Sequence, residues 1–200
     1  MTEQPTLLFA REEIDARVRA LGAEIEGSCA GRELCVVGLM KSAMVFMADL
    51  IRAIPLPQTC HFLQSASLRD ASDPMASTDI VYSTDIPYAG QHVLLLDDMI
   101  DTGITLSFLV DHIRDHSPAS VQVCTLIDKP GERKVDVHPD WAAFTLDRRL
   151  ERFIVGYGLG YQERFRALPY LATIPVSAPV VEGRRATVSS AAPDESDKES

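Results

Sequence analysis

The chain carries little positive charge. It has 19 Lys and Arg residues against 29 Asp and Glu residues, which gives a formal net charge of −10 at pH 7. An acidic surface repels polyanions, so this balance argues against a nucleic-acid partner and against binding to an anionic membrane surface. A small polyanionic substrate remains compatible with it, because Mg²⁺ and backbone amides can supply a positive field locally.

The sequence also lacks paired cysteines and long apolar runs. Its cysteines are Cys29, Cys35, Cys60 and Cys124. This spacing indicates neither a zinc site nor a disulfide framework, so we expect free thiols in a reducing compartment. The N-terminus shows no basic-then-apolar signal pattern, and no apolar run approaches the ~20 residues of a membrane span. We therefore predict a cytoplasmic protein with no membrane partner.

The composition suits one globular domain. Hydrophobic residues make up 46% of the 200 positions and charged residues 24%, which is ordinary usage for a chain with a sizeable core. We place this single domain at residues 1–176. Residues 177–200 are rich in Pro, Ser, Ala, Glu and Asp without periodicity, which predicts a disordered tail.

The most informative stretch is 93–105. It opens with the apolar run Val93–Leu96, typical of a strand buried on both faces. Two adjacent acids, a third acid and a Thr-Gly-x-Thr turn follow. Apolar residues then recur at helical spacing at Leu106, Leu109, Val110 and Ile113. This strand–loop–helix junction would lie at the carboxyl ends of a parallel sheet, where ligands bind.

The residue types in this loop suit a ribose phosphate. Thr102, Gly103 and Thr105 stand where the helix begins, so free N–H groups and the helix dipole favour an anion there. Asp97 and Asp98 can accept hydrogen bonds from ribose hydroxyls or hold a hard divalent cation through water. The alternative is an acidic turn that caps an ordinary helix. The complete string of strand, two acids and Asp-Thr-Gly-x-Thr favours the ligand site.

The rest of the chain predicts an alternating α/β order. Helices are expected at about 11–26 and after residue 43, and strands at about 34–39, 59–64, 121–127 and 171–174. Two strand–helix–strand units in succession imply a parallel sheet with right-handed crossovers.

The 93–105 string resembles the phosphoribosyl-diphosphate (PRPP) motif of type I phosphoribosyltransferases, and its Ile-Asp-Thr-Gly form is similar to the hypoxanthine-guanine branch. Residues 45–52, 123–130 and 153–159 agree with that family in order. The resemblance implies the type I fold: a central, mostly parallel twisted sheet flanked by helices. It also implies a small hood from about 135–144 and 153–174, and a homo-oligomer, either a dimer or a tetramer.

The resemblance implies an enzyme of purine salvage. The expected reaction transfers the 5-phosphoribosyl unit of PRPP to N9 of a 6-oxopurine and releases pyrophosphate, with Mg²⁺ as cofactor. The purine base would be hypoxanthine, with guanine the second candidate. One alternative is a regulatory protein on the same fold that binds nucleotide or PRPP with weak or no turnover. Another is a purely structural partner in a hetero-oligomer.

The resemblance also assigns roles to single residues. Asp101 would be the catalytic acid/base at the purine N7, and Asp97 and Asp98 would hold Mg²⁺ and the ribose hydroxyls. The residues expected to bind PRPP or its phosphates are Asp97, Asp98, Asp101, Thr102, Gly103, Ile104, Thr105, Lys41, Ser42 and Arg166. The residues expected to contact the purine are His138, Phe153 and Ile154.

Four positions depart from the family pattern. Ser42 replaces a glycine, Leu68 replaces a tyrosine in a segment (65–82) where the family has a mobile lid, and His138 replaces a lysine. Gly160 replaces an aspartate that usually helps hold Mg²⁺ and can contact the guanine amino group. The change at 160 therefore favours hypoxanthine over guanine. All four lie at the expected site, which is why the regulatory alternative stays open.

Overall fold

The main body is a six-stranded sheet. The computed structural model describes residues 4–67, 78–81, 86–147 and 152–175. The strand order is β4 (Thr78–Val81), β3 (Gln58–Ser67), β2 (Leu34–Met40), β5 (His92–Ile100), β6 (Ser120–Asp128) and β7 (Trp141–Thr145). Five of these strands run parallel and β4 pairs antiparallel with β3. The predicted fold class is confirmed.

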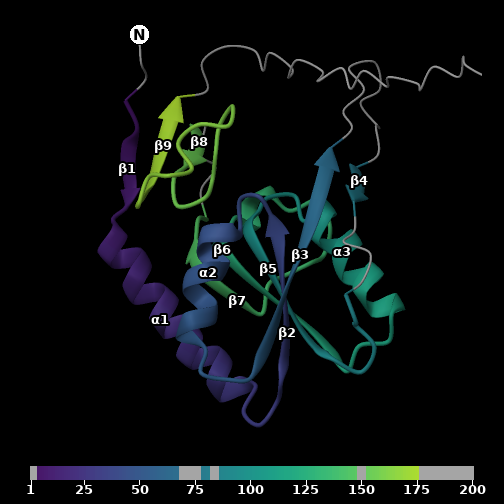
Figure 1. Ribbon diagram of the computed structural model, residues 1–200. Helices are drawn as coiled ribbons and strands as arrows, with labels where there is room; N and C mark the ends of the chain where they lie inside the picture. Colours follow the sequence, from purple (N-terminus) through teal and green to yellow (C-terminus); the bar gives the residue numbers. More distant parts are fainter. Residues whose placement is uncertain (1–3, 68–77, 82–85, 148–151, 176–200) are drawn as a thin grey trace, which may run out of the picture.

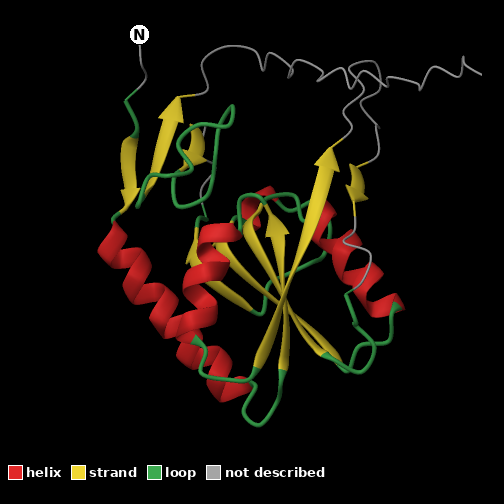
Figure 2. Cartoon of the chain, viewed as in Figure 1, coloured by secondary structure: helices red, strands yellow, loops and turns green. Residues whose placement is uncertain are grey.

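Helices cover both faces of this sheet (Figures 1 and 2). They are α1 (Arg11–Ser28), α2 (Met44–Ala53) and α3 (Ile104–Asp115), with a 3₁₀ turn at Pro130–Glu132. Successive side chains of a strand point to opposite faces, so Val36 packs in the core with α1 and α2 while Val37 packs in the core with α3. The central strand β5 is likewise buried on both sides, as its apolar run predicted.

A second, three-stranded antiparallel sheet forms the hood, in the order β1 (Thr6–Phe9), β9 (Leu171–Pro175) and β8 (Arg152–Val155). The prediction placed residues 135–144 in the hood, and for residues 141–144 it was wrong. Trp141 pairs with Cys124, so that segment supplies the edge strand of the large sheet. The sequence of a five-residue strand can indicate that a strand forms, but it does not indicate which strand it pairs with. The N-terminal strand β1 was not predicted.

Side chains join the hood and α1 to the edge strand β7. The rings of Phe9 and Phe144 stack with their centroids 3.9 Å apart. Arg17, on α1, donates hydrogen bonds to the carbonyl oxygens of Ala142 (2.9 Å) and Ala143 (3.0 Å). The edge of β7 is therefore covered by an arginine from the first helix.

Two predicted segments lie wholly or largely outside the described residues. They are the lid predicted at 65–82, of which 68–77 and 82, including Leu68, are not described, and the tail at 177–200. Within the described ranges, no helix is long and apolar enough to cross a membrane.

Candidate active site

The predicted loop joins β5 directly to α3. Gly103 precedes the first residue of α3 and has a left-handed φ of 80°. A Cβ atom added there would lie 2.5 Å from Cγ1 of Val137, which no real contact permits. The position therefore needs glycine both for its backbone angle and for the close approach of the 133–137 segment.

A hollow of about 280 Å³ lies against this loop. Its lining residues are Asp97, Met99, Ile100, Asp101, Thr102, Gly103, Thr105 and Leu106. The first-turn N–H groups of α3 have no partners within the helix, so the hollow offers the donors and the positive dipole end that a phosphate requires. Ile104 begins α3 with an exposed side chain, and its N–H donates to the Thr102 hydroxyl at 3.4 Å.

Asp97 and Asp98 form a carboxyl pair at the end of β5. Burial and the neighbouring Asp98 raise the pKa of Asp97 well above its usual range. Burial also raises the pKa of Asp98, opposed by hydrogen bonds from the Asp97 carboxyl and the Ser42 hydroxyl and by the charge of Arg166. The pair therefore resists carrying two negative charges at once, with Asp97 retaining the proton longer.

This donor set fits a divalent cation. A cation beside the buried Asp97 and the half-buried Asp98 would replace the proton that the pair otherwise holds. No cluster of three or more metal-ligating side chains occurs among the described residues. Any Mg²⁺ bound by the pair would therefore complete its shell with water or ligand oxygens, as this ion usually does.

Asp101 forms an ion pair with Lys129, which the sequence analysis did not single out. Lys129 Nζ lies 2.5 Å from Asp101 Oδ1, and the lysine side chain is only 13% exposed. Lys129 directly follows β6, the parallel neighbour of β5. Its position at the carboxyl end of a neighbouring strand was the signal that could have identified it.

Arg133 is a second residue that sequence reasoning missed. Its Nη1 donates to the carbonyl oxygens of Ile100 (2.7 Å) and Asp101 (2.6 Å). Its Nε donates to Val137 O (3.0 Å), and its Nη2 pairs with the Asp128 carboxylate. One buried guanidinium thus fixes the end of β5 against the end of β6 and the 133–137 segment.

Lys41 and Arg166 come together from opposite sides of the site. Lys41 follows β2, in a turn whose Met40–Lys41 peptide bond is cis, and Arg166 belongs to the hood. Both contact Glu163: Lys41 Nζ at 3.2 Å and Arg166 Nη2 at 3.3 Å. The two predicted phosphate-binding cations are therefore held by one carboxylate.

The missing acid at position 160 leaves room for Arg166. A Cβ atom at Gly160 would lie 2.8 Å from Nε and Cζ of Arg166. Nη1 of the same guanidinium donates to the Gly158 carbonyl (2.9 Å), and its charge acts on Asp98. A cationic side chain thus packs over the position where the resemblance predicts an anionic one.

The predicted purine contacts fall into two groups. Phe153 is the second residue of β8; it is 38% exposed, its ring centroid lies 4.8 Å from that of Tyr161, and Ile154 beside it is buried. His138 is exposed and lies on the surface with its Nε2 3.1 Å from Asp136 Oδ1. Lys129 is the more deeply buried cation, and its contact with Asp101 places it directly at the loop.

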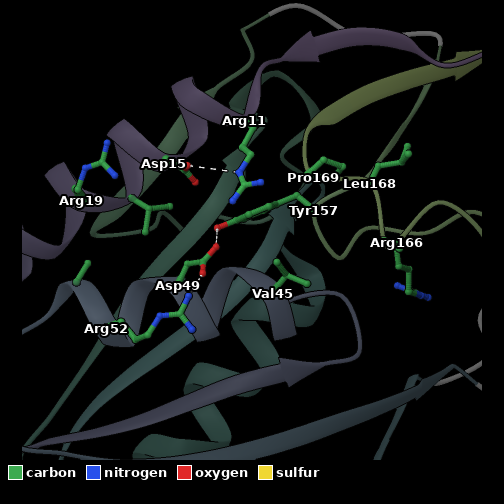
Figure 3. Close-up of a pocket in the computed structure, with 13 residues that line it drawn as sticks. Arg11, Asp15, Arg19, Val45, Asp49, Arg52, Tyr157, Arg166, Leu168 and Pro169 are labelled. Atoms are coloured by element: carbon green, nitrogen blue, oxygen red, sulfur yellow. Dashed lines mark hydrogen bonds and ion pairs between the residues drawn. The ribbon is translucent and has the colours of Figure 1, made fainter.

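A larger hollow of about 560 Å³ lies between α1, α2 and the hood (Figure 3). Most of its charges are paired with each other: Arg11 with Asp15, and Asp49 with both Arg52 and the Tyr157 hydroxyl. It also lacks the helix start and the acid pair of the loop. We therefore assign the chemistry to the smaller hollow. The hydrogen bond from Tyr157 to Asp49 connects the hood to α2.

The phosphoribosyl transferase domain model matches residues 8–162 of this chain. The chain belongs to the phosphoribosyltransferase family. The hypoxanthine-guanine phosphoribosyltransferase of Bacillus subtilis is 35% identical over 168 residues, covering 84% of this chain and 92% of that protein. The hypoxanthine phosphoribosyltransferase of Haemophilus influenzae is also 35% identical, over 84% of this chain and 94% of its own length.

A solved phosphoribosyltransferase has the same fold. The hypoxanthine-guanine phosphoribosyltransferase of Bacillus anthracis superposes with a TM-score of 0.79 at 33% identity, covering 87% of this chain and 99% of that one. The resemblance inferred from the loop is therefore confirmed for the family and for the fold.

Proposed function

We propose that this phosphoribosyltransferase transfers the 5-phosphoribosyl unit of PRPP to N9 of a 6-oxopurine and releases pyrophosphate, as a glycosyltransferase of purine salvage. The observation that carries the proposal is the junction of β5 and α3, where Asp97, Asp101 and the start of α3 line one small hollow and Asp98 lies beside Asp97. Relatives that match most of the chain are named hypoxanthine or hypoxanthine-guanine phosphoribosyltransferases, which supports it.

The 5-phosphate would lie at the start of α3. The backbone N–H groups from Asp101 to Thr105 would donate to its oxygens, and Gly103 would let it approach the chain closely. The hydroxyls of Thr102 and Thr105 would add side-chain donors. Because these donors belong to a loop anchored by Arg133, they would be in place before the substrate arrives.

Asp97 and Asp98 would bind the ribose hydroxyls and the water-bound cation. A bound Mg²⁺ would neutralise charge on the departing pyrophosphate, which is the chemistry that this cofactor supplies. Lys41 and Arg166 would offer N–H donors to the same leaving group, and the Ser42 hydroxyl supports the Asp98 carboxylate.

Asp101 would hold the proton exchanged with the purine N7 while the bond at N9 forms. Two residues are candidates for reading the purine oxygen: His138, as predicted, and Lys129. We favour Lys129, because it is buried at Asp101 whereas His138 is paired with the exposed Asp136. Phe153 would stack on the ring and Ile154 would offer backbone groups to its edge.

The absence of an acid at Gly160 favours hypoxanthine over guanine. A guanine 2-amino group needs an acceptor, and the side chain that packs over Gly160 is Arg166, which can only donate. We therefore expect the guanidinium to favour a base without an amino group at that edge.

The test is a pyrophosphate-release assay with PRPP and Mg²⁺, run separately with hypoxanthine, guanine, xanthine and adenine. Turnover with hypoxanthine, exceeding that with guanine, is the expected result. If no pyrophosphate is released with any of the four bases but calorimetry shows that PRPP binds, the chain would instead be a PRPP-binding regulator on the same fold.

A further inference from the structure

Glu163 joins the two sides of the proposed pyrophosphate site. It lies in the hood turn between Tyr161 and Arg164, which form an isolated antiparallel bridge, and has a left-handed φ of 60°. One of its carboxylate oxygens accepts from Lys41 Nζ at 3.2 Å and the other from Arg166 Nη2 at 3.3 Å. A single side chain therefore uses both of its oxygens to hold two cations from segments far apart in the sequence.

The carboxylate of Glu163 stays charged in this position. Its hydrogen bonds with Lys41 and Arg166, together with the charges of these residues, lower the pKa of Glu163 below its ordinary value. Both of its partners are donors without acceptor capacity, and both suit phosphate oxygens as well as a carboxylate. An incoming diphosphate would thus compete with Glu163 for the N–H groups of Lys41 and Arg166.

Exposure makes the exchange feasible. The side chains of Glu163 and Lys41 are 68% and 58% exposed, so their ion pair is screened by water and weak. A diphosphate carries several charges where the carboxylate carries one, so it can displace Glu163. The displaced carboxylate would then remain near the bound anion and repel it.

We propose that Glu163 is an anionic placeholder that holds Lys41 and Arg166 in the empty site and competes with the diphosphate group for them. The inference rests on the proposed function, because that function assigns these two cations to pyrophosphate. Its consequence is a double role: Glu163 keeps Lys41 and Arg166 near each other between turnovers, and it lowers the affinity for pyrophosphate, which favours release of this product.

The experiment compares the binding of inorganic pyrophosphate, with Mg²⁺, to the full chain and to Glu163→Gln by calorimetry. The glutamine keeps the size and backbone demands of the side chain and removes its charge. We expect roughly three- to tenfold tighter binding, as for the loss of one exposed and one partly exposed ion pair, with a gain that shrinks as salt is raised. Glu163→Asp, whose shorter side chain spans the two cations less well, should give a smaller gain.

Two controls separate local competition from net charge. Glu33→Gln makes the same charge change at an exposed position just before β2. This position lies at the amino ends of the parallel strands, away from the proposed site, so the variant should leave binding unchanged. In a Lys41→Met background, the gain from Glu163→Gln should fall, because one of the contested donors is gone.

The outcomes are distinct. Unchanged or weaker pyrophosphate binding by Glu163→Gln and Glu163→Asp, with measurable binding by the parent protein, would overturn the placeholder and leave the proposed function intact. A gain equal to that of Glu33→Gln would also overturn it. If the parent protein binds no pyrophosphate, both the inference and the proposed pyrophosphate contacts fail.

Discussion

The loop after β5 and the hood turn at 156–166 supply the two groups of residues of the proposed site, and they are built differently. In the loop, the acids and the helix start follow each other along the chain and are fixed by backbone contacts and a buried arginine. In the hood turn, Glu163 and Arg166 reach the site through side-chain contacts that are partly exposed. We infer that the loop carries the acid/base step, whereas the hood turn sets the affinity for pyrophosphate and the preference among purines.

The most severe test of this division is Asp101→Asn. Loss of a general acid/base residue typically lowers the rate roughly 10²–10⁴-fold, and we expect a fall of that order in kcat with hypoxanthine. Asp111→Asn, at an exposed position on α3, is the matched control and should leave kcat unchanged. An Asp101→Asn enzyme with parent-like turnover would remove Asp101 from the mechanism.

Asp97→Asn tests the acid pair through pH. Because the pKa of Asp97 is raised in the folded protein, the folded state holds protons that the unfolded state has lost. In the absence of Mg²⁺, the free energy of unfolding should therefore fall as the pH rises above about 4. Asp97→Asn should flatten this fall, and Mg²⁺ should offset it in the parent protein only.

Urea unfolding at several pH values, with and without Mg²⁺, measures this effect. Asp111→Asn should keep the parent pH dependence. A parent protein and an Asp97→Asn variant with identical profiles would show that burial of the pair has no energetic consequence.

Gly103→Ala tests the backbone of the loop. The left-handed φ and the contact with Val137 should destabilise the variant by roughly 1–3 kcal/mol and raise the KM for PRPP. Gly27→Ala in α1, where an added Cβ meets nothing within 4 Å, is the control and should be neutral or stabilising. Thermal unfolding that ranks the two variants equally would contradict the role of Gly103.

Tyr157→Phe should have the smallest effect. The Tyr157 hydroxyl donates to Asp49 Oδ2 at 2.5 Å and ties the hood to α2. Its removal should lower the free energy of unfolding by about 1 kcal/mol with kcat nearly unchanged. Tyr161→Phe, which keeps the ring contact with Phe153, is the control for stability. A large loss of kcat in Tyr157→Phe would contradict a purely structural role for this contact.

Sequence reasoning succeeded where the relevant residues are neighbours in the chain. Residues 93–105 follow each other in the chain as strand, acids, glycine turn and helix start, so their local order alone predicts the junction. The structure has β5 and α3 on either side of this turn, as expected. It did not find Lys129 or Arg133, because their contacts with Asp101 depend on β6 lying beside β5. It misplaced residues 141–144 for the same reason, since the partner of a short strand is a property of the fold.

Arg17 has a consequence for how copies of this chain can meet. The outer edge of β7 would otherwise present unpaired carbonyl groups, which are a template for a strand from another molecule. The guanidinium already occupies the carbonyl oxygens of Ala142 and Ala143. A second chain that extended the sheet there would first have to displace this arginine of α1, so we expect the Arg17 contact to disfavour strand pairing at the outer edge of β7.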